Sequence, residues 1–444
     1  MTTLAPLAAL AAALTVAAAS AQPVLSDSDA AFLHDQARRI VASARLAPGG
    51  TNRTPYVMHV PGGNMGYPAF WVRDAVMMLG SDLVSVSDLE DWIRLMCSVI
   101  RNRDWHVRPG VVVPAYALPD HINFDGRATF YPGSLETGSK QGGAPWGKYP
   151  PLDDHFYFIQ AVYEHSKMSG NTALLKKKMT TAFGRMRLLK LCERAYRVAP
   201  VDPKSGLCVA GDIDTENAKD FGFCDAESKS GKLLFPSILR FTAARELAEL
   251  FRAAGNPRKA KAFEKEAASI RQAIAPAFLH AGWLYSATGV GNQPDVWGSA
   301  FAVYSGAVDP ETARTVALSL ARAYREKTAV REGCVRHILS DDAWQVTLSP
   351  RGEYQNGGYW GTATGWYIAA INTVDEAAAR DMGRDYIQFL REHEAWEWFN
   401  PDTGKHNNPL YVATVALPYV TLQQAGLLQT GRSNKTIGES ARNH

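Results

Sequence analysis

The chain has few cysteines and little net charge. Its five cysteines in 444 residues are too few for a disulfide-rich scaffold, and none has the spacing of a metal-ligand motif. The net charge of +3, with both signs interspersed, excludes the basic field that nucleic acid or anionic lipid requires. We therefore expect no metal site and no nucleic-acid partner. Cys208 and Cys224 either form one bridge or, with Cys97, Cys192 and Cys334, remain buried free thiols.

Long apolar runs are absent beyond the N-terminus, so we expect no membrane-spanning helix, which would need roughly 18 such residues. Residues 1–21 are rich in Ala and Leu, carry no charge, and close with Ala19-Ser20-Ala21, a pattern that signal peptidase cleaves. The segment lacks a Lys or Arg near Met1, and an unstructured Ala-rich end is the alternative. We predict a signal peptide over 1–21, cleavage before Gln22, and a secreted or periplasmic protein.

Alternation typical of strands is scarce, whereas apolar residues recur with the helical period. Helix start and stop signals agree, with Ser26 to Asp29 before the first stretch and Gly255-Asn256-Pro257 between the sixth and seventh. No linker rich in Pro and Ser or in charge divides the pattern. Lys176 to Lys178 falls in a helical stretch, so we expect a solvated helix face. The twelve stretches lie near 28–45, 72–82, 87–102, 153–169, 173–195, 234–254, 257–276, 296–307, 309–326, 361–372, 374–392 and 409–426.

Very short links between these stretches alternate with long loops. Short links make antiparallel hairpins, so every long loop should emerge on the same face. Loops longer than about 15 residues are uncommon unless they are functional. Six hairpins closed into a ring predict an all-α fold, an (α/α)6 toroid over 22–444 as a single domain; a two-domain helical array is the alternative. The long loops lie at about 103–152, 196–233, 277–295, 327–360 and 393–408.

Carboxylates stand among aromatic and glycine residues in these loops. Glu397 is followed by Trp398, Phe399 and a Pro-Asp-x-Gly turn, and 70–74 and 214–225 have a similar composition. Such acids suggest a sugar pocket, in which one carboxylic acid protonates a leaving group and a carboxylate activates water. Tryptophans that could stack on sugar rings gather in or beside the same loops. They are Trp71, Trp105, Trp146, Trp283, Trp297, Trp360, Trp396 and Trp398.

On these residues the chain resembles a six-hairpin glycosidase, over about 70–424. Trp71-Val72-Arg73-Asp74 is similar to the Trp-x-Arg-Asp element of glucoamylase-like members. The resemblance implies that Trp71, Arg73 and Asp74 hold the terminal sugar, with Arg supplying a fork of donors and Asp two acceptors. The alternative is a local Arg–Asp pair that caps the following helix.

The segment from Phe235-Pro236 to Trp283-Leu284-Tyr285 is similar to the middle hairpin of processing α-glucosidases and of glucosylglycerate or mannosylglycerate hydrolases. The resemblance places the general acid in the preceding loop, although the usual Asp-Asn-Ser-Pro is absent. Asp220 ranks first because Phe-Gly-Phe follows it, an apolar setting that would raise a carboxyl pKa, and Asp225 ranks second. The loop acids are Asp212, Asp214, Glu216, Asp220 and Asp225, with Asp214 assigned to substrate binding.

Glu397 and its sequence to Gly404 resemble the element that bears the catalytic base in this family, with Glu394 as the alternative base. Residues 354–361 resemble the Tyr-His-Asn-Gly-x-x-Trp-Pro element, with Gln355 and Gly361 replacing its His and Pro. The expected substrate contacts also include Trp398 and two residues at helix starts, Asp154 and Trp297. Asp154 and His155 should face the loop rim, and Asp295 is either an N-cap or a sugar contact. From the element at 354–361 the expected contacts include Gln355, Asn356 and Trp360.

The resemblance implies hydrolysis of a non-reducing-end glycosidic bond by inversion, on an α-glucoside-like oligosaccharide and without a cofactor. A carbohydrate-binding protein that has lost the acid is a second hypothesis. A polysaccharide lyase or unsaturated-uronide hydrolase is a third, although the long loops are not rich in the Arg and Lys that uronates would require. Fold resemblance alone does not separate the three, and the oligomeric state stays open.

Overall fold

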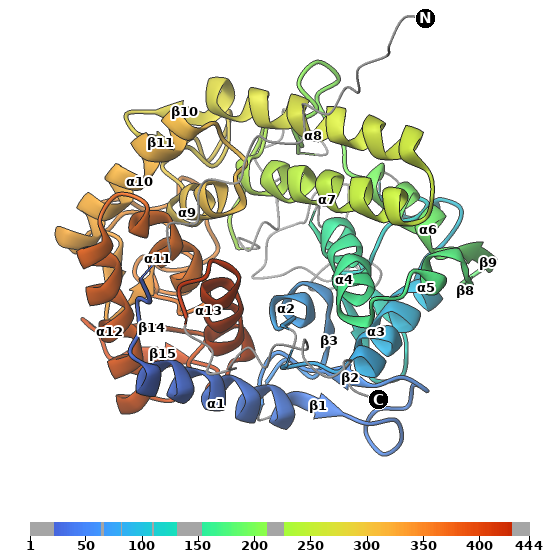
Figure 1. The fold of residues 1–444 in the computed structure, drawn as a ribbon, viewed down its shortest axis with the longest axis horizontal. Helices are drawn as coiled ribbons and strands as arrows, with labels where there is room; N and C mark the ends of the chain where they lie inside the picture. Colours follow the sequence, from blue (N-terminus) through green and yellow to red (C-terminus); the bar gives the residue numbers. More distant parts are fainter. Residues whose placement is uncertain are drawn as a thin grey trace, which may run out of the picture.

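The computed structural model is a double ring of helices (Figure 1). Six inner helices surround the axis, each packs on the next, and α13 returns to α2, so the inner ring is closed. The expected (α/α)6 toroid is confirmed. The inner helices are α2 (Val72–Met77), α4 (Asp154–Ser169), α7 (Leu234–Ala253), α9 (Val296–Ser305), α11 (Thr364–Asn372) and α13 (Val412–Gln424). The structure describes residues 22–63, 66–80, 82–108, 111–130, 153–210 and 226–428.

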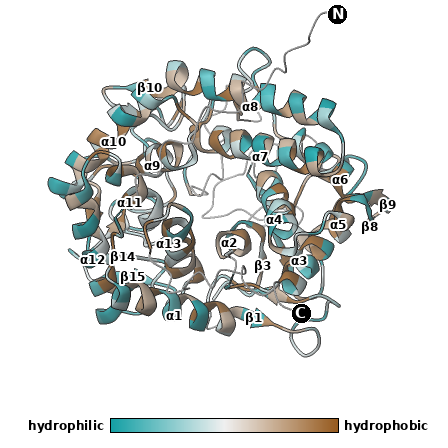
Figure 2. Cartoon of the chain, viewed as in Figure 1, coloured by the Kyte–Doolittle hydropathy of each residue, from teal (hydrophilic) through white to brown (hydrophobic). Residues whose placement is uncertain are grey.

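The outer ring covers the inner ring with amphipathic helices. In α12 the buried positions Ala378, Met382, Tyr386 and Leu390 recur every four residues, which gives one apolar stripe. The outer sides of α8 and α12 show hydrophilic colours in Figure 2. By contrast, every residue of 412–422 in α13 is buried, as expected for a helix enclosed by neighbours. The outer helices are α1 (Asp27–Ala44), α3 (Val86–Val99), α6 (Leu188–Tyr196), α8 (Pro257–Phe278), α10 (Pro310–Arg325) and α12 (Glu376–Glu392).

Short links at 254–256, 306–309 and 373–375 join the inner helices α7, α9 and α11 to the outer helices that follow them. Asn256 accepts a hydrogen bond from the Lys259 N–H and caps α8, whose first residue is Pro257. The links from an outer helix to the next inner helix are long, so they meet at the end of the ring where the inner helices begin. This arrangement confirms that the long loops share one face.

Small antiparallel sheets brace the long loops. Six are β1 (Arg45–Leu46) with β2 (Met58–His59); β3 (Ala69–Trp71) with β6 (His121–Asn123) and β7 (Ala128–Thr129); β4 (Trp105–Arg108) with β5 (Val111–Val113); β10 (Leu279–His280) with β11 (Trp283–Leu284); β12 (Val330–Arg331) with β13 (Cys334–Val335); and β14 (Trp398–Asn400) with β15 (Lys405–Asn407). No helix in the described part of the chain is long and apolar enough to cross a membrane.

The continuous helix expected over 173–195 is wrong. The short α5 (Ala173–Lys176) ends early, and β8 (Lys178–Thr181) and β9 (Gly184–Arg187) form a hairpin before α6. Thr180 and Thr181 favour a strand over a helix, and Gly184 has a φ of 118°, which a side chain would rarely adopt. β8 also alternates exposed and buried residues, so a strand period was hidden inside the helical pattern.

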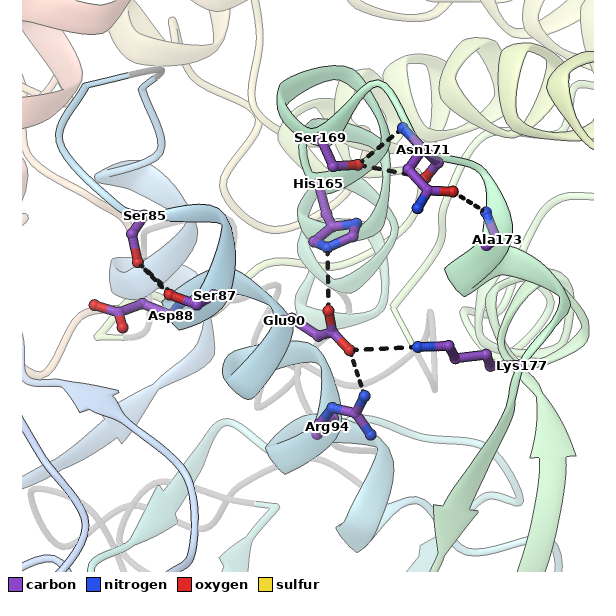
Figure 3. Close-up of polar contacts among 10 residues, drawn as sticks. All are labelled: Ser85, Ser87, Asp88, Glu90, Arg94, His165, Ser169, Asn171, Ala173 and Lys177. Atoms are coloured by element: carbon purple, nitrogen blue, oxygen red, sulfur yellow. Dashed lines mark hydrogen bonds and ion pairs between the residues drawn. The ribbon is translucent and has the colours of Figure 1, made fainter.

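The lysine cluster therefore lies at the start of this hairpin, and one of its members joins three elements. Figure 3 shows Glu90 of α3 facing His165 of α4 and the Lys177 ammonium, at 3.8 and 3.9 Å, and also Arg94 one turn along α3. Lys177 thus takes part in an ion-pair network that connects an outer helix, an inner helix and the link after it. Such partly exposed pairs contribute about 1 kcal/mol or less each.

Buried thiols account for the cysteines that the structure describes. Cys97, Cys192, Cys208 and Cys334 are buried and free. Cys224, the suggested partner of Cys208, lies outside the described residues, as does the expected signal peptide.

Candidate active site

Glu397 lies on the long-loop face, directly before β14, and is only 2% exposed. The Tyr67 hydroxyl donates to both carboxylate oxygens of Glu397 at 3.0 Å, and Asn407 Nδ2 approaches Oε2 at 3.4 Å. The Glu397 N–H bonds the carbonyls of Asn407 and Asn408, each at 3.1 Å. Donors at both oxygens stabilise the charged carboxylate and fix its orientation.

The segment 354–361 lies beside β14, the strand that directly follows Glu397. Tyr359 and Phe399 exchange two backbone hydrogen bonds, of 2.8 and 3.0 Å, and Asn400 Nδ2 donates to the Gly352 carbonyl. A Cβ on Gly358 would lie 2.9 Å from Trp398 Cε3 and 2.7 Å from the Tyr354 carbonyl. Glycine at this position therefore allows the two segments to approach each other.

Asp74, in the first turn of α2, is connected to Glu397 through two tyrosines. The Tyr411 hydroxyl donates to Asp74 Oδ1, and the Tyr411 and Tyr67 rings lie 6.5 Å apart between centroids. Burial raises the pKa of Asp74 to about 6, although the Tyr411 hydrogen bond and the Arg73 charge act in the opposite direction. Asp74 and Glu397 therefore lie on the same face of the ring.

Arg73 pairs with a residue eighty positions away rather than with its neighbour in sequence. Its Nε and Nη2 donate to the two oxygens of Asp153 at 2.7 and 3.3 Å, and Nη2 lies 3.6 Å from Asp120. The pair joins the starts of α2 and α4, and Arg73 is only 6% exposed. A role for Arg73 in binding sugar stays a prediction, and in this structure the guanidinium anchors two inner helices.

Asp154 and His155 lie below the loop rim, because both side chains are almost fully buried. Burial and the nearby Asp153 charge raise the pKa of Asp154 well above its ordinary value, and neither of its oxygens has a hydrogen-bond partner among the described residues. Burial lowers the pKa of His155 to about 3. Burial therefore disfavours the charged form of both side chains.

Trp71 differs from the other tryptophans assigned to the site, because it is partly exposed. Its ring stacks on His121 at 4.3 Å, and His121 Nδ1 lies 2.8 Å from Asp120. Trp71 also meets the Tyr67 ring edge-on at 5.5 Å, so it lies next to the tyrosine that bonds Glu397. It is thus the tryptophan in the described site best placed to contact a sugar ring.

The remaining tryptophans of the expected site are buried in packing contacts. Trp297 is fully buried and stacks on His337 with 3.8 Å between centroids. Trp360 is 1% exposed and its Nε1 donates to the Tyr354 carbonyl at 3.2 Å. Trp398 is 8% exposed in β14. In this structure they shape the loops around Glu397.

The amides expected to bind hydroxyls bond the protein's own backbone. Gln355 Oε1 accepts from the Ala226 N–H at 2.9 Å, and Asn356 Oδ1 accepts from the Trp344 N–H at 3.1 Å. These bonds attach the motif to neighbouring long loops. Asp295 accepts from the Gly298 N–H at 2.7 Å, which confirms the N-cap interpretation.

Residue patterns alone did not identify several members of this site. Tyr67, Asp120, Asp153 and Tyr411 act through contacts between segments distant in sequence, so no local pattern marks them. Asn407 lies only ten residues from Glu397, but the sequence alone did not assign it a contact with the carboxylate. The five loop acids at 212–225, with Asp214, Asp220 and Asp225 among them, lie outside the described residues, as does Trp146.

Backbone strain also gathers around Glu397. Tyr67, Tyr354, Asn408 and Leu410 have φ values of 54°, 46°, 48° and 59°, a region that residues other than glycine rarely adopt. Such conformations cost of order 1–3 kcal/mol and cluster at functional sites. No group of three or more His, Cys, Asp or Glu in the described ranges is arranged to hold a metal ion.

Comparisons with known proteins agree on the fold. No family model and no curated protein sequence matches the chain. Among solved structures, a rhamnosidase from Klebsiella oxytoca with rhamnose bound matches with a TM-score of 0.57 and 13% identity, over 91% of this chain and 66% of that one. The chain has the fold of the six-hairpin glycosidases.

Two further solved structures support this assignment. A GH63 mannosylglycerate hydrolase from Thermus thermophilus in complex with Tris matches with a TM-score of 0.55 and 12% identity, over 87% of this chain and 99% of that one. A GH78 rhamnosidase of a Bacillus species matches at 0.52 and 15% identity, over 89% and 35%. The chain thus spans nearly all of the mannosylglycerate hydrolase but only part of each rhamnosidase.

Proposed function

We propose that the protein is an exported glycoside hydrolase that cleaves a non-reducing-end glycosidic bond by inversion. The observation that carries the proposal is the Glu397 carboxylate on the long-loop face. The Tyr67 hydroxyl holds both of its oxygens, and the Tyr67 ring lies against Trp71. The fold supports it, because the similar structures are named as a mannosylglycerate hydrolase and as rhamnosidases. The sugars in these names, rhamnose and mannose, are candidate substrates to test. The substrate that we propose, on the motif resemblance, is an α-glucoside-like oligosaccharide.

In the proposed reaction Glu397 acts as the general base. Its carboxylate removes a proton from water while that water attacks the anomeric carbon, and a second carboxylic acid protonates the departing oxygen. Asp220 or Asp225 would supply this acid. Inversion requires room for the water, so the two carboxyl groups should be about 6.5–9.5 Å apart.

Replacing Glu397 by Gln tests the base directly. Gln preserves the shape of the side chain but takes no proton, so the rate should fall on the order of 10²–10⁴-fold while substrate binding is largely kept. Turnover is measured on aryl α-glucosides, α-mannosides and α-rhamnosides, with Glu394→Gln as the matched control. Proton NMR of early product should show the anomer opposite to that of the substrate.

The outcomes separate the hypotheses. Full activity in Glu397→Gln would reject this residue as the base, and early product with the starting anomer would reject inversion. Sugar binding without turnover by the unmodified protein would favour the carbohydrate-binding alternative. An unsaturated product would indicate a lyase.

A further inference from the structure

A cavity of about 1090 Å³ lies inside the inner ring. Its lining runs from early residues of the inner helices, such as Tyr157 and Trp366, to their last turns. Lys167 of α4, Glu249 of α7, Ser305 of α9, Asn372 of α11 and Gln424 of α13 all come from the last turns of their helices. Glu397, Tyr67 and Asp74 of the proposed hydrolase site are not among the residues that line this cavity.

The ends of the helices make this cavity favourable for positive charge. All six inner helices begin on the long-loop face, so their carboxyl ends converge here, and each carries roughly half a negative charge. Three glutamates, Glu164, Glu246 and Glu249, line the wall with two bases, Lys167 and Arg245. Both the backbone and the side chains therefore contribute negative potential.

One of these glutamates lacks a counterpart. Glu249 accepts from the Tyr163 hydroxyl at 2.8 Å, and Glu164 lies 3.8 Å from the Lys167 ammonium. Glu246 Oε2 is buried and has no hydrogen-bond partner among the described residues. Burial, reinforced by the charges of Glu164 and Glu249 and opposed by those of Arg245 and Lys167, raises the pKa of Glu246 to about 8. A buried acceptor without a donor is uncommon in folded proteins and indicates a missing partner.

The lining selects the kind of partner. No described group of acidic or His and Cys side chains is arranged for a metal ion, whereas an ammonium or guanidinium group would donate to Glu246 in a charge-assisted bond. Tyr304, Phe301 and Trp366 also line the cavity and offer aromatic faces for a cation or for methylene groups. The volume is that of a site for a small organic ligand.

We propose that this cavity binds an organic cation, an alkylammonium or guanidinium group, with Glu246 as its anchor. Two sources share this chemistry. One is a free polyamine. The other is the chain itself, because Leu427 lines the cavity and the sequence that follows it is basic. Residues 429–444 contain three cationic side chains, Arg432, Lys435 and Arg442, and one acid, Glu439.

Calorimetric titration of the full chain with spermidine tests the proposal. Glu246→Gln should weaken binding at least about tenfold, because a charge-assisted hydrogen bond becomes a neutral one. Its thermal unfolding midpoint should stay the same or rise, since the variant removes an unpaired buried carboxyl. Glu326→Gln, an exposed glutamate at the end of α10, is the matched control, and Glu249→Gln is a second variant if the first does not fold.

A full-length triple variant, R432A/K435A/R442A, separates the sources. If the chain's own cations fill the cavity, spermidine should bind the triple variant at least about tenfold more tightly than the unmodified chain. If a free amine is the ligand, the two proteins should bind alike and Glu246→Gln should bind less well than either. The proposal would be overturned if Glu246→Gln, the triple variant and the unmodified chain all bound spermidine equally. It would also be overturned if neither the unmodified chain nor the triple variant bound spermidine. Hydrolase activity is measured in parallel, and its loss or absence does not affect this result.

Discussion

At the level of single residues, Tyr67 connects Glu397 to the rest of the site. Its hydroxyl is the donor to both oxygens of Glu397, and its ring lies against Trp71 and Tyr411. A φ of 54° holds the tyrosine in a strained conformation that the surrounding loops must enforce. Glu397 could be recognised from its motif, but Tyr67 could not, because the contact spans 330 positions.

Replacing Tyr67 by Phe should slow turnover without unfolding the protein. The change removes one hydroxyl that holds the Glu397 carboxylate, so kcat should fall roughly tenfold or more. The ring and its packing remain and Asn407 still donates to Oε2, so urea unfolding should shift by no more than the about 1.5–3 kcal/mol of a hydrogen bond to a charged group. Tyr359→Phe, next to the same strand, is the control; an unchanged kcat in Tyr67→Phe would remove Tyr67 from the site.

Asp154 should make folding stability depend on pH. Its pKa is raised in the folded protein, so above the ordinary Asp pKa of about 3.9 the folded state binds more protons than the unfolded state, and stability falls as pH rises. Asp154→Asn should remove this contribution, up to about 1.4 kcal/mol per pH unit. Unfolding measured at pH 4, 6 and 8 checks it, with the exposed Asp341→Asn as control. Parallel curves for the wild type and Asp154→Asn would show that the carboxyl is ionised when folded.

At the level of elements, helix positions could be predicted well because period and caps agree along the chain. The failure at 173–195 has a local cause. The leucines on both sides of β8 and β9 keep a helical spacing, so the pattern continues across the hairpin and hides it: they are Leu174, Leu175, Leu188 and Leu191. Thr181 and Gly184 are the residues that indicate the hairpin. Placement of the small sheets could not be predicted, since their register depends on contacts between loops.

The contact between 354–361 and β14 supplies a test at this scale. Gly358→Ala would force a Cβ against Trp398 and the Tyr354 carbonyl, at an expected cost of roughly 1–3 kcal/mol. Chemical denaturation measures it, and turnover should fall with it because β14 follows Glu397. Gly404→Ala has open space around its Cβ but a φ of 69°, so it isolates the cost of backbone strain, of about 1–2 kcal/mol. A Gly358→Ala protein as stable as the wild type would contradict the close approach.

At the level of the whole molecule, the toroid follows from alternating short and long links, but the site at its centre does not. The order of inner helices predicts which loops share a face. It does not predict that Arg73 pairs with Asp153 or that Tyr411 bonds Asp74, because these contacts depend on how closely neighbouring helix starts approach. Asp220 and Asp225 remain predictions of the sequence.

The N-terminal segment contacts the C-terminal end of the ring, so signal-peptide cleavage should leave Val24 and Leu25 on the mature protein. The Val24 N–H donates to the Leu427 carbonyl at 3.0 Å, and Val24 and Leu25 are 4% and 5% exposed. Cleavage before Gln22 would keep these contacts, so N-terminal sequencing of exported protein should begin at Gln22.

Removing residues through Leu25 from that mature form should destabilise it. Burying an apolar side chain contributes about 1.5–3 kcal/mol, and Leu25 also packs against Gly383 of α12. Thermal unfolding of the shortened form against one that begins at Gln22 measures the loss. An intact Met1 on protein that stays in the cytosol would overturn export, while equal stability of the two forms would show that the segment is not needed to join the ends of the ring.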